Sequence, residues 1–351
     1  MIDLGPVRDI TRPGPRLDAG VEAALERHAG HGGSPPRDVE GIVACGCLTA
    51  LLETYWLTAD RVPLVALDDE EGARVDRDAP PIVDAHVHFF PDRVFEALWA
   101  WFERYAWPIR YRLKSPEVAS FLLERGVTRV VALHYGHKPG MARALNAYVA
   151  ALAQSEPRIV PLATVLPGEP DALEILRDAL DAGAHGVKLH CHVQCFAPDD
   201  VACDPLFAEC ATRGVPVVMH AGREPKSDAY AVDAYAVSGA SRVEAALMRH
   251  PTLRLCIPHF GADEPRAFCR LMERFEGLHL DSTMMISDFF PMDGAREILA
   301  AFPDRVLFGT DFPNLPYAWD REAKRALRLG LTDDALARFL GENARAFYRI
   351  D

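Results

Sequence analysis

The stretch Ile82-Val83-Asp84-Ala85-His86-Val87-His88-Phe89-Phe90 decides the fold. It begins with two apolar residues and contains two histidines that are separated by a single valine. Side chains alternate between the two faces of a β-strand, so His86 and His88 are expected to point the same way. Two imidazoles that converge at a strand end form half of a metal site. The simpler interpretation is a strand with two incidental histidines. The choice between a metal site and incidental histidines depends on the residues elsewhere in the chain.

A repeating pattern begins after residue 80, in which a short apolar run rich in β-branched residues alternates with a helical stretch. The eight runs are 82–90, 127–133, 159–165, 186–190, 215–220, 253–259, 278–282 and 306–311. Helices are predicted at 141–154, 171–182, 205–213, 241–250, 265–275, 294–302 and 333–348. Such alternation is typical of a parallel sheet covered by helices. Eight repeats predict an α/β fold of the (β/α)8, or TIM, barrel type. A doubly wound open sheet is the alternative, although the first run lacks a glycine-rich dinucleotide loop.

Residues 1–79 differ in composition from the remainder of the chain. A loop rich in Gly, Pro, Arg and Asp comes first, and the apolar stretch 38–58 then predicts a helix. We expect this helix to pack on the barrel or on a second subunit, which would make a homo-oligomer. An acidic stretch and Pro80-Pro81 mark a boundary near residue 80. The predicted organisation is therefore a mainly helical extension at 1–79 and a barrel with C-terminal helices at 80–351.

Charge and composition restrict the partners. The 351 residues carry a formal net charge of −13, which argues against nucleic acid and against an anionic membrane surface. No apolar run approaches the roughly 20 residues of a membrane span, and the N-terminus lacks a secretory signal. The eight cysteines include no CxxC pair and are interpreted as reduced thiols. We expect a cytoplasmic protein whose partner is a small-molecule substrate.

The polar residues at the ends of the predicted strands form a constellation. Catalytic residues of a TIM barrel lie at the C-terminal ends of its strands. The residues that fall there are His86, His88, Lys188, His190, His220, His259 and Asp311. Imidazole nitrogens and one carboxylate suit Zn²⁺ and related divalent ions. Such an ion lowers the pKa of bound water to about 7 or polarises a carbonyl, and a further histidine can move protons.

In these motifs the chain resembles the amidohydrolase superfamily, in the branch related to aminocarboxymuconate-semialdehyde decarboxylase. The matching motifs are Asp84-Ala85-His86-Val87-His88, Gly186-Val187-Lys188-Leu189-His190, His220-Ala221-Gly222, Pro258-His259-Phe260-Gly261, Gly309-Thr310-Asp311-Phe312-Pro313 and Gly341-Glu342-Asn343-Ala344-Arg345. The resemblance runs from about residue 80 to the end and has no counterpart in 1–79.

The resemblance implies a role for each matching residue. It implies that His86, His88, His220 and Asp311 hold one divalent metal, most often zinc. It also implies that His259 shuttles protons beside the metal, and that Asp311 acts catalytically on bound water. In other branches a lysine at the position of Lys188 is carboxylated and bridges two metals, so a second metal is the alternative to an amine that binds a substrate anion.

Several residues near the motifs have open roles. His190 is interpreted as a substrate contact, a partner of the metal ligands or a structural residue. Arg223 is a candidate for binding a substrate carboxylate, because a guanidinium matches that geometry, and the alternative is a solvated loop residue. The segment Cys191-His192-Val193-Gln194-Cys195 departs from the family pattern and raises thiol ligation as a minor alternative. Asp281 is expected to orient its neighbours.

Three functions are consistent with the constellation. The leading expectation is a metal-dependent hydrolase in which metal-activated water attacks a lactone, amide or ester carbonyl of a small, carboxylate-bearing substrate. The alternative is nonoxidative decarboxylation of an aromatic or muconate-like acid at the same metal site. A third, of another class, is a non-catalytic barrel with a structural metal, which the intact set of histidines disfavours.

Overall fold

The computed structural model describes residues 67, 69–224, 229–290, 292 and 294–351. The predicted helix at 38–58 lies outside these residues, so the proposed extension and its role in oligomerisation stay predictions. No helix within the described residues is long and apolar enough to cross a membrane.

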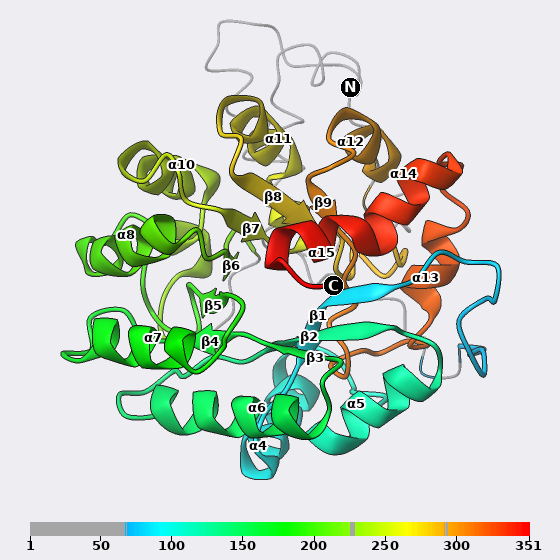
Figure 1. The fold of residues 1–351 in the computed structure, drawn as a ribbon, viewed down its shortest axis with the longest axis horizontal. Coiled ribbons are helices and arrows are strands. Elements are labelled where there is room, and N and C mark those ends of the chain that lie inside the picture. Colours follow the sequence, from blue (N-terminus) through cyan, green and yellow to red (C-terminus); the bar gives the residue numbers. More distant parts are fainter. Residues whose placement is uncertain (1–66, 68, 225–228, 291, 293) are drawn as a thin grey trace, which may run out of the picture.

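Parallel strands form a closed ring at the centre of the molecule (Figure 1). The strands are β1 (Val83–His88), β2 (Arg129–Leu133), β3 (Ile159–Pro161), β4 (Ala163–Thr164), β5 (Val187–His190), β6 (Val217–His220), β7 (Leu255–Ile257), β8 (Leu278–Asp281) and β9 (Val306–Leu307). β3 and β4 are two parts of the predicted run 159–165, separated only by Leu162. The nine segments therefore make the eight strands expected from the sequence.

Two junctions close the ring between its two hydrogen-bonded sheets, β1 to β3 and β4 to β9. At one, the Leu162 amide donates to the Ala132 carbonyl at 3.3 Å. At the other, the chain beyond β9 pairs with β1: the Ala85 amide donates to the Phe308 carbonyl at 2.9 Å and the His88 amide to the Phe312 carbonyl at 2.8 Å. The (β/α)8 barrel prediction is confirmed.

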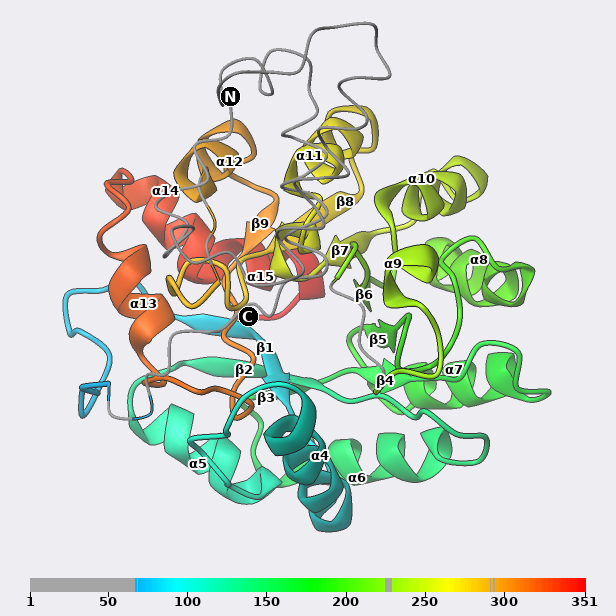
Figure 2. The same cartoon turned by 180° about the vertical axis from the view of Figure 1, so that it is seen from behind.

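Helices surround the ring on its outside, as Figure 2 shows from behind. They are α4 (Asp92–Tyr105), α5 (Ser115–Glu124), α6 (Ala142–Ser155), α7 (Ala172–Asp181), α8 (Asp204–Arg213), α9 (Ala234–Val237), α10 (Ala240–Arg249), α11 (Pro265–Arg274), α12 (Ala295–Ala301), α13 (Arg321–Ala326), α14 (Asp333–Ala337) and α15 (Asn343–Tyr348). Their inner faces follow helical spacing, as in α11, where Phe268, Leu271 and Met272 are buried. The six helices predicted between strands correspond to α6, α7, α8, α10, α11 and α12.

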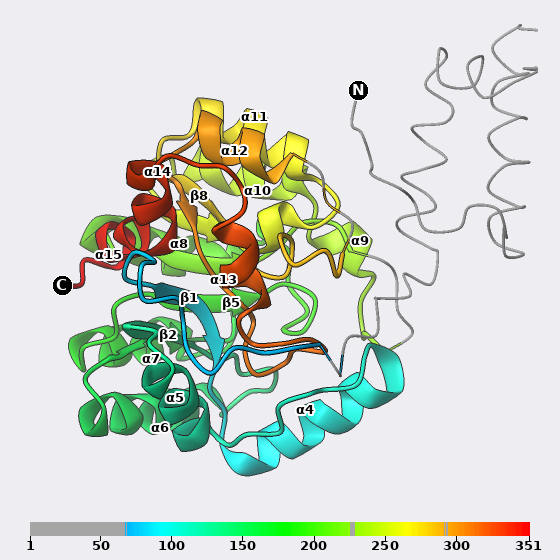
Figure 3. The same cartoon turned by 90° about the vertical axis from the view of Figure 1, so that its right-hand side faces the viewer.

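The predicted closing helix is one helical segment of α14, a π-helical turn at Arg338–Glu342 and α15. It opens as expected, because the Thr332 hydroxyl accepts from the Ala335 amide at 3.3 Å. Phe347 and Tyr348 of α15 join a buried apolar cluster with Val83, Val218 and Leu307 from the strands. α15 thus closes the end of the barrel where the strands begin, and α4 and α9 lie toward the opposite side (Figure 3). The polar residues at the strand ends occupy that other end.

The acidic segment before the barrel is packed against it. The Gly72 amide donates to Asp320 at 2.8 Å, and the Trp319 indole donates to the Gly72 carbonyl at 3.0 Å. The Arg110 guanidinium donates to the Asp69 carbonyl at 2.7 Å. Residues 69–72 are therefore held on the barrel surface through contacts that the composition of the sequence does not reveal.

Candidate metal centre

Three of the four predicted metal ligands meet at the mouth of the barrel. His88 Nε2 lies 2.8 Å and His86 Nε2 lies 3.4 Å from the same carboxylate oxygen, Oδ1 of Asp311. The three side chains are buried, and one ligand atom from each lies within 4.8 Å of the others. We call the residues His86, His88 and Asp311 the first group.

The strand that carries the two histidines is not regular. The register of β1 on β2 shifts between Asp84 and Val87, a β-bulge around His86. Bulges commonly re-aim a side chain next to active sites. Both histidines lie close to Asp311, as the alternation of side chains along a strand predicts. The strand between them and Asp84 is nevertheless bulged and not regular.

Two further carboxylates position the first group. Asp281 at the end of β8 accepts from His86 Nδ1 at 2.9 Å, which turns His86 Nε2 toward Asp311. Asp84 accepts from the Thr310 hydroxyl at 2.6 Å and from the His86 amide at 3.1 Å, so it ties β1 to the segment that carries Asp311. Burial raises the pKa of the Asp84 carboxyl to about 7. The orienting role expected of Asp281 agrees with these contacts.

The first group fits a divalent ion. His86 Nε2 is buried and has no hydrogen-bond partner within the described residues. Burial, more than any neighbouring charge, holds the pKa of His86 well below its usual range, so the imidazole is neutral and its lone pair is available. Neutral imidazole and carboxylate are the ligand types of many Zn²⁺ and Mn²⁺ sites.

His220, the fourth predicted ligand, lies in a different cluster. It joins His190 and His192, with one ligand atom from each within 4.8 Å of the others; we call these three residues the second group. His220 Nε2 donates to Oε1 of Glu224. Its predicted role as a ligand of the first ion therefore stays a prediction.

His259 lies between the two groups. Its ring centroid is 5.5 Å from that of His86 and 4.7 Å from that of His220. Its Nδ1 donates to the Thr283 carbonyl at 3.0 Å, because a carbonyl can only accept. That contact leaves Nε2 as the nitrogen that exchanges a proton, which suits the predicted shuttle.

Lys188 on β5 is fully buried, and its Nζ has no hydrogen-bond partner among the described residues. Burial lowers the pKa of Lys188 to about 8, while the negative charges of Asp281 and Asp311 oppose that shift. The amine is thus close enough to Asp311 to sense its charge. No described carboxylate forms an ion pair with it, and its contact with a substrate anion stays a prediction.

The other two predicted substrate contacts have different surroundings. The His190 ring stacks on His220 at 4.1 Å between centroids and meets the Tyr135 ring edge-on at 4.8 Å, so it lies inside the mouth. Arg223 Nε lies 3.1 Å from Glu264, and its guanidinium also donates to Tyr235. The carboxylate-binding role of Arg223 stays a prediction, with Glu264 as a competitor.

Sequence reasoning assigned no role to Glu224, Tyr135 or Tyr230. Glu224 comes four residues after His220, and this spacing is its only signal in the sequence. Tyr230 contacts the His192 ring at 4.4 Å between centroids. Among the described residues, neither the first nor the second group contains a cysteine. Burial raises the pKa of the Cys191 thiol well above its usual range. The structure therefore gives thiol ligation no support.

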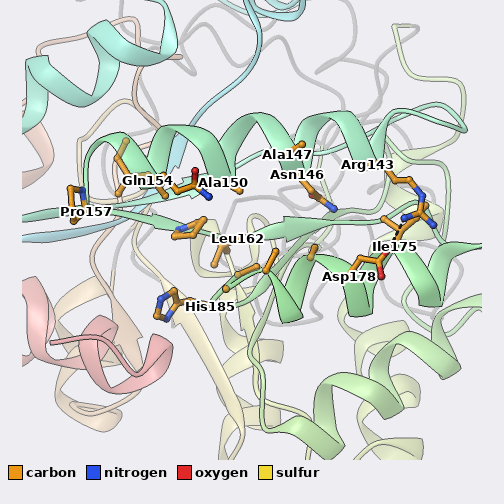
Figure 4. A pocket seen from close by; sticks show the side chains of 17 residues that line it. Arg143, Asn146, Ala147, Ala150, Gln154, Pro157, Leu162, Ile175, Asp178 and His185 are labelled. Carbon is orange, nitrogen blue, oxygen red and sulfur yellow. Dashed lines mark hydrogen bonds and ion pairs between the residues drawn. The ribbon is translucent and has the colours of Figure 1, made fainter.

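A separate hollow of about 450 Å³ lies between α6 and α7 beside β3 (Figure 4). Arg143 and Asp178 form an ion pair at one end of it, and His185 lies at the other. None of the predicted site residues lines it. The predicted site residues therefore lie apart from this hollow.

Comparisons with known proteins identify the family and the fold of the chain. The family model described as amidohydrolase matches residues 83–350, whereas no curated protein sequence matches the chain. Three solved structures cover most of it.

A TIM-barrel protein of Bordetella bronchiseptica is 21% identical, with a TM-score of 0.59, and the alignment covers 77% of this chain and 98% of that one. The 2,6-dihydroxybenzoate decarboxylase of Rhizobium is 17% identical, with a TM-score of 0.58, over 77% of this chain and 99% of that one. The 5-carboxyvanillate decarboxylase of Novosphingobium aromaticivorans, complexed with manganese and 4-hydroxy-3-methoxy-5-nitrobenzoic acid, is 17% identical, with a TM-score of 0.58, over 80% of this chain and 99% of that one.

At these identities the solved structures support the fold alone, and the family rests on the match over residues 83–350. This chain belongs to the amidohydrolase family of metal-dependent enzymes.

Proposed function

We propose that the chain is a metal-dependent decarboxylase that removes CO₂, without an oxidant, from a small aromatic or muconate-like acid. The observation that carries the proposal is the likeness over most of the chain to two decarboxylases of phenolic acids, one of them with manganese. This likeness supports the alternative expectation better than the leading one, hydrolysis. The histidines and aspartate at the mouth and the buried Lys188 are compatible with it.

The first group would hold the ion, with His220 as the fourth ligand predicted from the sequence. When bound, the ion would supply positive charge to the oxygen atoms of the acid. Zinc was the expected metal, and the manganese-bound neighbour gives Mn²⁺ equal standing. A second ion bridged by carboxylated Lys188 has less support, because the amine has no described carboxylate partner and suits an anion contact.

The residues of the chain divide the remaining tasks. Lys188 would bind a substrate anion through its buried ammonium. His259 would deliver a proton from Nε2 to the ring carbon that bears the carboxylate, while Thr283 holds Nδ1. As that proton adds, the bond between the ring carbon and the carboxylate breaks. Its electron pair stays on the ring and CO₂ leaves, so no oxidant or reductant is needed. His259 then regains its proton from water.

The test is a substrate panel with the metal-loaded full chain. Phenolic acids with a hydroxyl beside the carboxylate are incubated with enzyme loaded with Mn²⁺ or Zn²⁺ in D₂O. We expect release of CO₂ and one deuterium at the vacated ring carbon.

The same preparation is assayed with lactones, amides and esters. Hydrolysis of one of these without any CO₂ release from the acids would overturn the proposal in favour of the hydrolase. Inactivity toward both panels at full metal loading would count against it and favour the binding barrel.

A further inference from the structure

Six side-chain rings at the barrel mouth form a closed circle of contacts. Each ring meets the next at a centroid separation between 4.1 and 5.9 Å. In order around the circle, the rings belong to His86, His88, Tyr135, His190, His220 and His259. Two imidazoles separate Tyr135 from His259 in either direction, so these two residues occupy opposite positions. The proposed function uses His259 and gives Tyr135 no task.

Tyr135 lies in this circle because it continues the inward face of β2. Val131 and Leu133 of that strand belong to the buried cluster at the end closed by α15. Side chains alternate along a strand, so Tyr135 is the next residue on the same face. It comes two residues after the carboxyl end of β2 and is partly exposed. Side chains in this position of a TIM barrel are the ones that meet substrate.

The backbone next to Tyr135 is fixed without help from its hydroxyl. The Gly136 carbonyl accepts from Gln194 Nε2 at 2.9 Å, and Oε1 of the same Gln194 accepts from the His190 amide at 2.8 Å. One side chain thus ties the segment after β2 to the end of β5. The Tyr135 ring also meets the His88 and His190 rings nearly edge-on, at 84° and 68°. These contacts position the ring whether or not the hydroxyl is present.

The Tyr135 hydroxyl itself makes no hydrogen bond within the described part of the chain. A phenol keeps its proton at neutral pH. Burial, and after it the negative charge of Asp311, raises the pKa of Tyr135 further. The hydroxyl is therefore a donor without a described acceptor, and it lies close enough to Asp311 to sense its charge.

Proton delivery by His259 requires a particular orientation of the carboxylate. When a proton adds to one face of an aromatic carbon, the bond to the carboxylate breaks while it is aligned with the π electrons of the ring. The carboxylate then lies on the opposite face, and holding it there is a matter of orientation. We infer that Tyr135 binds the substrate, its hydroxyl donating a hydrogen bond to the carboxylate that leaves. The inference rests on the proposed function and adds a residue to it.

The hydrogen bond acts on binding more than on the chemical step. The carboxylate loses its negative charge as CO₂ forms, so the bond is strongest in the bound acid and weakens as the reaction proceeds. Tyr135 keeps its proton throughout. A contact that is stronger in the ground state than in the transition state lowers KM without raising kcat.

Binding of an unreactive aromatic acid tests the contact without turnover. The probe is 4-nitrobenzoate, whose ring has no hydroxyl to supply electrons for proton addition, and 4-nitrobenzamide is its neutral counterpart. Both are titrated by calorimetry into the Mn²⁺-loaded full chain and into Tyr135→Phe. The variant is expected to bind 4-nitrobenzoate about 10- to 100-fold more weakly, the worth of a hydrogen bond to a charged group. The benzamide should lose at most a few-fold, because its acceptor is neutral.

Tyr148→Phe is the matched control, because Tyr148 on α6 packs against the apolar cluster between the strands and the outer helices. It should bind both probes like the unaltered protein. On an acid that the substrate panel shows to be decarboxylated, Tyr135→Phe should raise KM about 10- to 100-fold and change kcat by less than about threefold. Its metal content and melting temperature should match those of the unaltered protein.

Equal affinity of Tyr135→Phe and the unaltered protein for 4-nitrobenzoate would overturn the inference. A loss as large for the benzamide, or no binding of 4-nitrobenzoate to the unaltered protein, would overturn it as well. A fall in kcat at unchanged KM would do the same, by placing the contact in the transition state. If the affinities differ as expected but no acid releases CO₂, the proposed function fails and the carboxylate contact stands. Release of CO₂ with equal affinities gives the reverse.

Discussion

Two of the residues expected to do the chemistry have a strained backbone conformation. Asp311 has φ 75° and His259 has φ 55°, both in the left-handed region that non-glycine residues avoid. Each is held by its neighbours, because the Asp311 amide donates to the His86 carbonyl at 2.9 Å and the His259 amide to Asp281 at 3.1 Å. Strain of order 1–3 kcal/mol per residue persists only where surrounding contacts impose it, which is common at active sites.

His259→Asn is expected to keep the metal and lose roughly 10²- to 10⁴-fold in kcat, the usual worth of a general acid. Asparagine tolerates the left-handed backbone, and its amide can still donate to the Thr283 carbonyl. Turnover and metal content of the purified variant check this. A variant that has lost the metal would make His259 a ligand instead.

Lys188→Met should separate activity from stability. Removing the ammonium is expected to raise KM for an acid substrate about 10- to 100-fold, the worth of a charged hydrogen bond. The melting temperature is expected to rise, since a buried cation without a described partner is replaced by an apolar side chain of similar length. Steady-state kinetics and thermal unfolding measure both. Lys138→Met, at an exposed lysine, is the control, and an unchanged KM for Lys188→Met would remove Lys188 from substrate binding.

At the scale of the elements, the contact between β1 and the chain after β9 sets the geometry of the first group. Gly309 lies in that contact, where an added Cβ would come within 2.4 Å of Thr283 Oγ1 and 2.7 Å of His86 Cβ. No side chain fits there unless the two segments separate. The glycine of the Gly309-Thr310-Asp311 motif is therefore needed for close approach.

Gly309→Ala is expected to destabilise the fold by about 1–3 kcal/mol, as overpacking does, and to weaken metal binding because it moves His86 away from Asp311. Gly239→Ala is the matched control, because a Cβ there meets its nearest atoms at an ordinary 3.6 Å. Urea unfolding and metal titration of both variants give the comparison. Equal behaviour of the two would contradict the close-approach argument.

The strands and helices were predictable where a single repeat of apolar residues extends along the whole element. The runs of buried β-branched residues located all eight strands, and the order of motifs located the first group. The β-bulge at His86 was not predictable, since it depends on how β1 pairs with β2. The hydrogen bond between Glu224 and His220 was not predictable either, because it depends on the conformation of a loop. Its only signal in the sequence is the spacing of four residues. α4 and α5 lie between the first two runs, where no helix was predicted.

At the scale of the whole molecule, the apolar packing consists of two buried clusters. One buried cluster lies between the strands and the outer helices, and another fills the end closed by α15. Neither includes the first group. The fold therefore has a core that a metal ion is not needed to complete.

Chelation is accordingly expected to abolish turnover while leaving a cooperative thermal transition and an unchanged far-ultraviolet circular dichroism spectrum. Adding Mn²⁺ or Zn²⁺ back should restore activity. Calorimetry before and after chelation is the measurement. Loss of the cooperative transition on chelation would indicate a structural metal and support the binding-barrel alternative.

His279 lies at the closed end of the barrel, and its burial there should make the free energy of unfolding depend on pH. This residue on β8 packs against the Phe347 ring of α15 at 4.6 Å between centroids, and its Nδ1 donates to the Gly277 carbonyl at 3.1 Å. Burial, helped by the charges of Arg254 and Arg305, lowers its pKa from 6.5 to about 4.

Between pH 6.5 and pH 4, His279 is protonated in the unfolded chain and neutral in the folded chain. The free energy of unfolding therefore decreases as the pH falls through this range. From pH 7 to pH 5 the contribution of His279 should amount to about 1–2 kcal/mol. Urea unfolding at both pH values should show His279→Gln losing less stability than the unaltered protein by that amount. The exposed-site variant His137→Gln should lose close to as much as the unaltered protein. Equal losses in all three proteins would mean that the contact between α15 and the barrel does not exclude the proton.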